Sequence, residues 1–334
     1  MPTIGDVARA AGVSRSTVSY ALSGKRTISR ETRGRIEAAI TRLGFTINAG
    51  ARALATSQTK VLGLLLQFHE DEFPPAMLQY VLPISDTARE LGYDILMVTE
   101  ADGRSALKRI TSSGMVDGVV LLDVTHDDPR LPPLREAAQP GALVGLPGDP
   151  SGLDVFDLDF GEAARMLVDH LHGLGHGEII VISPPRHVFD RGAAYSWRFR
   201  DAAVERGARY GLRMFPYDGE SRQPAINRSL HAILDARPSA TALIVHNDAT
   251  IAALPLVLVE RGVRVPADLS VVSLYSRNFG SSFSLPYTAI ETSPDKLGQQ
   301  AVRHLVRRID SPENAGAPVT RFIAPVLTDR GSTR

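Results

Sequence analysis

The spacing of apolar positions near the N-terminus predicts three short helices. The first helix has an apolar face formed by Ile4, Val7, Ala8 and Ala11. A second helix is expected over residues 15–22, with Val18, Ala21 and Leu22 on its apolar side. Gly12 separates the two, because a tight turn needs a residue that tolerates positive φ. Two helices that pack across so short a turn form a helix-turn-helix.

Each of these helices has the end signals that its boundaries require. Thr3, Ser14 and Ser29 precede the three helices, where a side-chain oxygen can accept a hydrogen bond from a free backbone N–H. The third helix is expected to bury Ile36, Ala39, Ile40 and Leu43. It ends at Gly44, and Phe45 follows as the hydrophobic contact of a C-cap. Three helices with one small shared core are sufficient to present the second helix to DNA.

Beyond residue 60, short apolar runs alternate with amphipathic segments. Strands are expected at 61–67, 93–99, 117–123, 142–146, 178–183, 242–246 and 269–274. Helices are expected at 77–91, 105–113, 160–174, 193–206, 227–236, 248–261 and 294–309. Continuous apolar strands separated by such helices predict parallel sheets covered on both faces. The span favours two doubly wound lobes, with a ligand cleft at the carboxyl ends of the strands.

One of these helices contains a proline. Pro255 lies inside the helix expected at 248–261, where it removes one hydrogen bond and should kink the helix at a cost of about 3 kcal/mol. We expect the kink to be tolerated.

The distribution of charge points to a polyanionic partner. The formal net charge of the 334 residues is zero, but residues 1–60 contain ten basic and three acidic side chains. The headpiece is therefore +7, and the remainder, with 27 basic and 34 acidic side chains, is −7. A basic module on an acidic body is typical of directed nucleic-acid binding.

Several other classes of protein are disfavoured. The sequence has no cysteine, which excludes disulfides and is compatible with the cytoplasm, the expected location. The N-terminus lacks the apolar run of a signal peptide, and the longest apolar runs, 61–66 and 251–259, are too short to span a bilayer. We therefore expect no membrane partner.

No catalytic or metal-binding constellation is apparent. The sequence lacks a G-x-S-x-G elbow and a phosphate loop of the Walker type. The glycines at 173, 175 and 177 follow a helix and are better explained by helix termination. His170 and His172 are two residues apart on a helix and so point in different directions. Neither an enzyme nor a cofactor is expected.

The headpiece pattern resembles that of the LacI/GalR family of bacterial transcriptional regulators. The family motif D-V-A-x-x-A-G-V-S-x-x-T-V-S is matched over residues 6–19, by Asp6, Val7, Ala8, Ala11, Gly12, Val13, Ser14, Thr17, Val18 and Ser19. The resemblance implies that the second helix enters a major groove, with Arg15, Ser16 and Tyr20 reading base edges. Phosphate contacts would come from Ser14, Thr17, Ser19 and Arg26, and Thr3 belongs to the same interface. The alternative, from the residues alone, is a packed helical hairpin that binds no DNA.

A second family motif follows the headpiece. The pattern N-x-x-A-R-x-L is matched by Asn48, Ala51, Arg52 and Leu54. In the family this segment is a hinge helix that forms on the operator, and Leu54 matches the leucine inserted into the minor groove. Ile47 replaces the usual proline and Gly50 lies inside the hinge. Both changes should make the helix harder to nucleate, the glycine by about 1 kcal/mol relative to alanine.

The body resembles the same family over nearly its whole length. The matching segments are residues 62–66, 116–122, 174–183, 247–248 and 264–273. The resemblance implies an effector domain similar to periplasmic sugar-binding proteins. The expected division is a helix-turn-helix domain at 1–46, a hinge helix and linker at 47–60, and an effector-binding and dimerisation domain at 61–334. The N-lobe would comprise about 61–159 plus 290–322, and the C-lobe about 160–289 plus the C-terminal strand.

The expected effector site departs from the family pattern. Tyr275 and Tyr195 occupy the positions where sugar-binding members commonly have an aspartate and an arginine. Phe73 and Asn247 match positions that line the cleft. Loss of both charged groups would leave aromatic rings to bind a flatter or less hydroxylated effector, or none. The alternative is that Arg191 supplies the guanidinium.

These observations predict a homodimeric transcriptional repressor. Its partners would be a near-palindromic double-stranded DNA operator and a small-molecule effector, carbohydrate-related or unusual, in the interlobe cleft. Effector binding would change the angle between the lobes. The competing prediction, based on Ile47 and Gly50, is a small-molecule binding protein of the same fold that has lost operator specificity.

Overall fold

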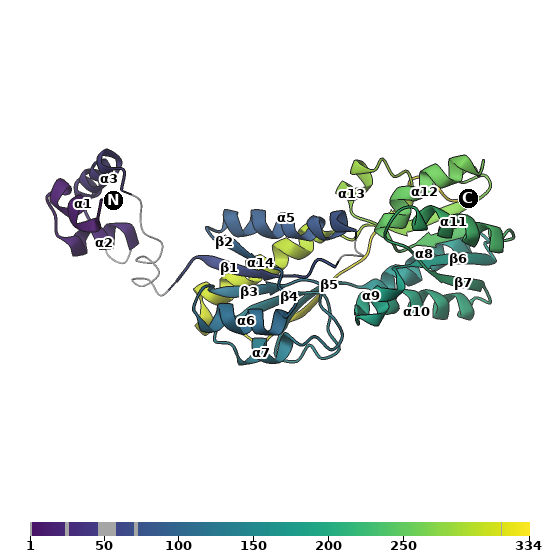
Figure 1. Cartoon of the computed structure of the whole chain (residues 1–334), viewed down its shortest axis with the longest axis horizontal. Helices are drawn as coiled ribbons and strands as arrows, with labels where there is room; N and C mark the ends of the chain where they lie inside the picture. The colour runs from purple at the N-terminus through teal and green to yellow at the C-terminus, as the bar shows by residue number, and fades with distance from the viewer. Residues whose placement is uncertain (1, 24–26, 46–57, 70–72, 315) are drawn as a thin grey trace. The chain divides into compact units, whose positions relative to one another are not determined.

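A computed structural model describes residues 2–23, 27–45, 58–69, 73–314 and 316–334. The chain divides into two compact units, residues 1–60 and 61–334 (Figure 1). None of the helices in the described ranges is long and apolar enough to cross a membrane.

The first unit contains the three predicted helices, α1 (Ile4–Ala11), α2 (Arg15–Ser23) and α3 (Arg30–Leu43). Thr3 and Asp6 form a reciprocal capping box, in which Thr3 Oγ1 accepts from the Asp6 N–H and Asp6 Oδ2 accepts from the Thr3 N–H. The turn after α1 depends on Gly12, whose φ of 66° lies in the left-handed region. The predicted helix-turn-helix is confirmed.

The headpiece core is small and joins all three helices. Val7, Val18 and Ile36, one from each helix, are at most 1% exposed. Phe45 packs against the same cluster from beyond α3, as its sequence position predicts. This core fixes the orientation of α2 relative to its neighbours, so the outward face of α2 is also fixed.

The predicted hinge lies outside the described residues. Residues 46–57 include Asn48, Arg52 and Leu54, and Arg26 belongs to the undescribed range 24–26. The roles assigned to these four side chains therefore remain predictions from the sequence.

The second unit contains two six-stranded sheets. The strand order of the N-lobe sheet is β11-β5-β4-β3-β1-β2, and all its strands are parallel. Its strands are β1 (Val61–Leu65), β2 (Asp94–Val98), β3 (Gly118–Leu121), β4 (Gly141–Val144), β5 (Asp154–Leu158) and β11 (Thr320–Ile323). The C-lobe sheet has the order β12-β10-β9-β8-β6-β7, and only β12 is antiparallel to its neighbour. Its strands are β6 (Glu178–Ser183), β7 (Arg213–Asp218), β8 (Ala242–Val245), β9 (Ser270–Leu274), β10 (Thr288–Ile290) and β12 (Leu327–Thr328).

Helices cover both faces of each sheet. The helices of the N-lobe are α5 (Pro74–Glu90), α6 (Gly103–Ser112), α7 (Leu131–Glu136) and α14 (Pro294–Asp310), and the short η1 (Pro312–Asn314) follows α14. The C-lobe contains α8 (Phe160–Gly173), α9 (Arg186–Asp190), α10 (Ala194–Arg209), α11 (Ala225–Ala236), α12 (Asp248–Glu260) and α13 (Arg277–Ser282). The chain passes between the lobes after β5, after β10 and after β11 (Figure 1).

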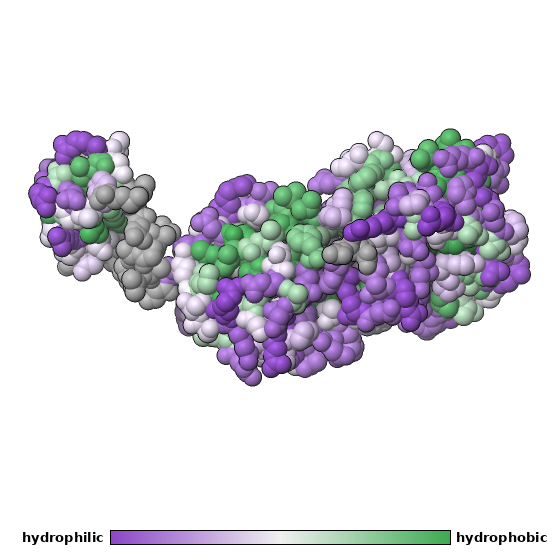
Figure 2. Space-filling model, in the orientation of Figure 1, coloured by the Kyte–Doolittle hydropathy of each residue, from purple (hydrophilic) through white to green (hydrophobic). Residues whose placement is uncertain are grey.

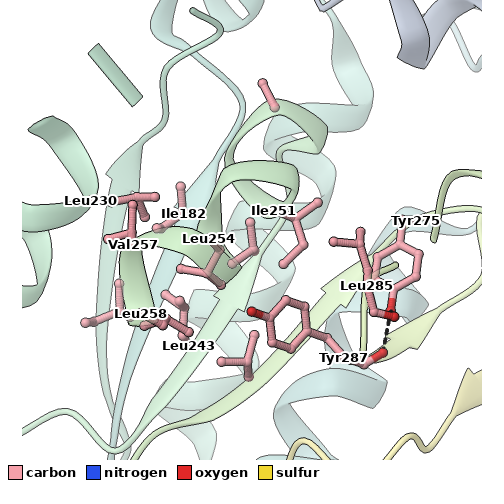
Figure 3. Packing of buried hydrophobic residues seen from close by; sticks show 14 of the residues in the cluster. Ile182, Leu230, Leu243, Ile251, Leu254, Val257, Leu258, Tyr275, Leu285 and Tyr287 are labelled. Atoms are coloured by element: carbon pink, nitrogen blue, oxygen red, sulfur yellow. Dashed lines mark hydrogen bonds between the residues drawn. The ribbon is translucent and has the colours of Figure 1, made fainter. Parts of the chain in front are cut away.

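The hydrophobic core follows this layering. Each sheet separates two buried clusters, and in the C-lobe one of them joins β6, β8 and α12 through Ile182, Leu243 and Leu254 (Figure 3). Since apolar strands are covered on both sides, the predicted pair of doubly wound parallel sheets is confirmed. Helix α12 continues through Pro255 without a break.

Two headpiece glycines should respond in opposite ways to replacement by alanine. Gly12→Ala places a side chain at φ 66° and should destabilise the headpiece by about 1–2 kcal/mol. Gly34→Ala adds a Cβ inside α3 with no atom within 4 Å and should stabilise the headpiece by about 1 kcal/mol. Hydrogen exchange of residues 2–45, measured in the full chain, checks both. Equal effects of the two changes would contradict the assigned turn.

Candidate functional site

The outward face of α2 carries polar and basic groups and no acidic residue. Arg15, Ser16 and Tyr20 are exposed, and Ser19 is partly exposed between them. Ser14 caps the helix: its Oγ accepts from the Thr17 N–H at 3.0 Å and lies 2.7 Å from Ser16 Oγ. Hydroxyl groups therefore cluster at the positive end of α2, where an anion such as a DNA phosphate is favoured.

Arg15 lies against α1 at Gly5, a contact that sequence reasoning missed. A Cβ built on Gly5 would be 2.9 Å from both Nε and Nη2 of Arg15. Gly5 lies inside α1 at negative φ, so the turn geometry that requires Gly12 does not account for it. The sequence offers one signal for this contact. A glycine inside a helix costs about 1 kcal/mol relative to alanine, so its presence at position 5 needs another explanation. The structure explains this glycine by the space that the guanidinium occupies.

The remaining described headpiece residues are placed as follows. Thr3 is exposed, but its hydroxyl is bonded to Asp6 at 2.7 Å. Thr17 is partly buried, with its hydroxyl 2.8 Å from Ser14 Oγ. The structure thus brings Arg15, Ser16, Ser19 and Tyr20 together on one face and uses Thr3 and Thr17 in the caps of their helices.

The second unit contains a cavity of about 230 Å³ between its two lobes. The lining comes largely from residues at the carboxyl ends of strands, including Leu122 after β3, Asp157 in β5 and His246 after β8. This is the position at which open α/β sheets bind ligands.

Four of the five predicted effector residues line the cavity. Phe73, Arg191, Tyr195 and Asn247 belong to the lining, whereas Tyr275 does not. The prediction for Tyr275 is corrected: its ring is 1% exposed, and its hydroxyl donates to the carbonyl oxygen of Tyr287 (Figure 3). The ring packs against Gly280, where a Cβ would lie 2.6 Å from it, so Tyr275 belongs to the C-lobe core.

Charged groups line the cleft from other positions, although tyrosines occupy the two positions where sugar-binding members have charged residues. Both Arg191 and Arg198 line the cavity, and each pairs with a carboxylate of the N-lobe. Arg191 Nη2 lies 3.3 Å from Asp123 Oδ1, and Arg198 forms a hydrogen-bonded ion pair with Asp157. The alternative in which Arg191 supplies a guanidinium agrees with this placement. Sequence reasoning did not assign Arg198, Asp123 or Asp157 to the site.

Asp123 has an unusual backbone conformation for a residue other than glycine. Its φ of 50° is left-handed, a conformation that Asp and Asn adopt more readily than most residues. Arg130, paired with Asp128 and 5% exposed, donates to the carbonyl oxygens of Leu122 and Asp123 at 2.9 Å and so holds this turn. Burial tends to raise the pKa of Asp123. The hydrogen bond with His69 and the charge of Arg191 outweigh that effect and keep the pKa below its ordinary value.

Two other carboxyl groups in the lining show the opposite shift. Burial raises the pKa of Asp157, although Arg198 acts in the other direction. Burial raises the pKa of Asp248 to about 7, partly offset by a hydrogen bond from Gln79 Nε2 at 3.3 Å. Gln79 lies in α5 and Asp248 in α12, so this contact also joins the two lobes. Asp248 is therefore a weakly acidic group facing the cavity.

Aromatic rings form one wall of the cavity. The ring centroid of Phe160 lies 5.4 Å from that of Tyr195 and 5.7 Å from that of His246. Burial lowers the pKa of His246 to about 3, so its imidazole is neutral at physiological pH. Within the ranges that the structure describes, no group of three His, Asp or Glu side chains is placed to hold a metal ion. The cavity combines hydrogen-bonding groups with flat apolar surfaces.

Comparisons with known proteins match both units. Residues 3–48 match the family described as bacterial regulatory proteins, lacI family. Residues 168–333 match the family described as periplasmic binding protein-like domain.

Individual proteins are similar over almost the whole chain. The HTH-type transcriptional regulator CelR of Thermobifida fusca is 28% identical over 319 residues, covering 92% of each chain. A solved complex of the transcriptional regulator CelR with cellobiose has a TM-score of 0.69 at 25% identity and covers 99% of this chain and all of that chain. The lac repressor dimer bound to operator and the anti-inducer ONPF has a TM-score of 0.82 at 23% identity, covers 99% of each chain, and so shares the fold.

The two family matches fall on the two units that the structure separates, and the regulator from Thermobifida fusca is similar along nearly its entire length. The chain therefore combines a DNA-binding domain of the lacI family of bacterial regulatory proteins with a periplasmic binding protein-like domain.

Proposed function

We propose that the protein is a transcriptional repressor that acts on DNA in the cytoplasm and binds a near-palindromic operator as a homodimer. The observation that carries the proposal is the outward face of α2, with Arg15, Ser16, Ser19 and Tyr20 available and no acidic residue. Arginine and small hydroxyl side chains are suited to read base edges and bind phosphates. The +7 charge of residues 1–60 favours the same polyanion. The family resemblance further implies minor-groove insertion by Leu54 and supporting contacts by Asn48 and Arg52.

Exposed apolar side chains support the homodimer. Leu78 and Leu82 of α5 are 44% and 60% exposed, and Leu256 and Val259 of α12 are 59% and 76% exposed. Figure 2 shows hydrophobic residues gathered over α5. Apolar groups grouped in this way favour association with a second copy, which would place two α2 helices on the two halves of one operator.

The cavity supports a small carbohydrate-related effector. Its arginine, asparagine and aspartate side chains can exchange hydrogen bonds with hydroxyl groups, and its aromatic wall can cover an apolar sugar face. The solved CelR complex contains cellobiose, and this chain shares the CelR fold over nearly all of its length. Because the lining comes from both lobes, an effector that binds there would change how the lobes are held together.

Operator recognition is tested by selecting binding sequences from a random DNA pool with the full chain. Near-palindromic sites are expected, with binding that weakens steeply as salt increases. Arg15→Ala should cost about 1–3 kcal/mol on the selected site and relax preference at one position in each half-site. The control is Arg9→Ala on α1, paired with Asp6, which should leave base preference unchanged. If the wild-type chain selects no DNA sequence, the repressor proposal fails. The competing hypothesis is then supported, namely a small-molecule binding protein without operator specificity.

Gly5 is expected to affect DNA preference without touching DNA. Gly5→Ala should displace the Arg15 guanidinium, because the new Cβ would lie within 3 Å of it. The far end of a flexible side chain moves cheaply, so the headpiece should remain folded. We expect altered preference at the base position that Arg15→Ala relaxes. Gly34→Ala is the matched control, and a Gly5→Ala protein with wild-type preference would refute the contact.

Asp248 should make the stability of the second unit depend on pH. The folded-state pKa of about 7 lies above the ordinary value of 3.8, so the folded state holds the proton longer than the unfolded state. Stability from this group is thus lost as pH rises from about 4 to about 7. Asp248→Asn should raise stability above pH 7 by roughly 1–3 kcal/mol, and this gain should shrink towards pH 4. Unfolding midpoints across pH measure this, with the exposed Asp201→Asn as control; parallel wild-type and Asp248→Asn curves would refute it.

A further inference from the structure

Both arginines in the cavity are already paired with carboxylates across the two lobes. Arg191 follows α9 and Arg198 lies in α10, both in the C-lobe. Their partners, Asp123 and Asp157, belong to the N-lobe, and these carboxylate side chains are only 8% and 5% exposed. The positive charge of each guanidinium is therefore neutralised before any ligand enters.

The carboxylates are also fixed by their own lobe. Asp157 accepts hydrogen bonds from the backbone N–H groups of Leu146 at 3.1 Å and Leu158 at 2.9 Å. Asp123 lies 3.2 Å from His69 Nε2, and Arg130 holds its backbone carbonyl. Neither carboxylate can follow its arginine to a new position without losing these contacts.

This arrangement disfavours an anionic ligand. A phosphate that took Arg198 would leave Asp157 buried without its cation, and separating a buried pair in this way is strongly unfavourable. The negative charges of Asp123 and Asp157 would also repel the phosphate at close range. Nor does the lining offer an excess of positive charge, because its two arginines face two aspartates, Asp123 and Asp157.

An uncharged ligand meets no such obstacle. Among the described residues, Arg198 Nε and His246 Nδ1 are buried side-chain atoms of the lining that have no hydrogen-bond partner. A hydroxyl group can bond to either atom and leave both ion pairs intact. The rings of Phe160 and Tyr195 add apolar contact that requires no charge.

We propose that Asp123 and Asp157 are specificity-determining residues, which make the cavity accept uncharged, hydroxyl-bearing ligands and reject their phosphate esters. This inference rests on the proposed function only in taking the cavity as the effector site. It does not depend on DNA binding.

The test measures binding of inorganic phosphate to the full chain by thermal shift and titration calorimetry. The wild-type protein should show no saturable phosphate binding that depends on Arg198, so any binding by the headpiece is unchanged in Arg198→Gln. The double variant Asp123→Asn/Asp157→Asn should gain it, with a rise in unfolding midpoint of about 2–4 °C, because two unpaired guanidinium groups then face the cavity. Asparagine keeps an acceptor for the backbone N–H groups at position 157 and tolerates the left-handed backbone at position 123.

Two further variants separate a specific effect from general salt stabilisation. Asp149→Asn removes an exposed carboxylate that pairs with Arg135 within the N-lobe, and it should gain no phosphate binding. Adding Arg198→Gln to the double variant should reduce the gain, because only one of the two guanidinium groups then remains. If the double variant does not fold, the single variant Asp157→Asn should still gain phosphate binding, because it leaves the Arg198 guanidinium unpaired.

Two results would overturn the proposal. One is saturable binding of phosphate or glucose 6-phosphate to the wild-type protein that Arg198→Gln removes. The other is a folded double variant with no gain in phosphate binding. Both binding measurements can be interpreted even if the protein selects no operator sequence, because the probe is phosphate and no DNA is present.

Discussion

The pairing of charges across the cavity is the constraint that joins the two lobes of the second unit and sets the chemistry of its cavity. Two parallel sheets direct the carboxyl ends of their strands towards one space, and polar side chains from both must be buried there. Burial of one such charge alone would be strongly unfavourable, but Arg198 with Asp157 and Arg191 with Asp123 satisfy each other. The same contacts that make burial possible therefore connect the lobes and limit what the cavity can bind.

Most of the fold could be predicted from local pattern. The alternation of apolar strands with amphipathic helices gave both doubly wound lobes, and β6 was found with its correct ends at Glu178 and Ser183. The headpiece helices could also be predicted from the sequence. Their ends are set by residues that act through neighbours a few positions away, namely Thr3, Gly12, Ser14, Ser29 and Gly44. Signals of this kind are contained in a short window of sequence.

The elements that were missed depend on contacts distant in sequence. The apolar pattern does not predict strand β5, because Asp154 and Asp157 interrupt its apolar run. All five of its residues are nevertheless buried. Asp154 is paired with His304 at 3.1 Å and with Arg308, about half the chain away, and Asp157 with Arg198. Strand β7 was overlooked for the opposite reason, because it lies at the edge of its sheet and is only partly buried.

The residues of the candidate site also divide into those that could be predicted from the sequence and those that could not. Phe73, Asn247 and Tyr195 were assigned through the family resemblance and do line the cavity. Tyr275 was assigned in the same way and does not, because its orientation is set by Gly280 and by the carbonyl of Tyr287. The acidic partners Asp123 and Asp157 were missed, since a carboxylate at a strand end is indistinguishable in sequence from a solvated loop residue until its partner is known.

A net charge of zero conceals a division of function between the two units. The headpiece carries an excess of seven positive charges, so its attraction to phosphate is strong, long-ranged and weakened by salt. The second unit carries the opposite excess, and its arginines in the cavity are neutralised pairwise at short range, where salt has little effect. A phosphate group should therefore be attracted by the headpiece and rejected by the cavity of the second unit. That arrangement would keep the effector cavity insensitive to the phosphorylated compounds that surround it, while α2 remains free to engage the DNA backbone.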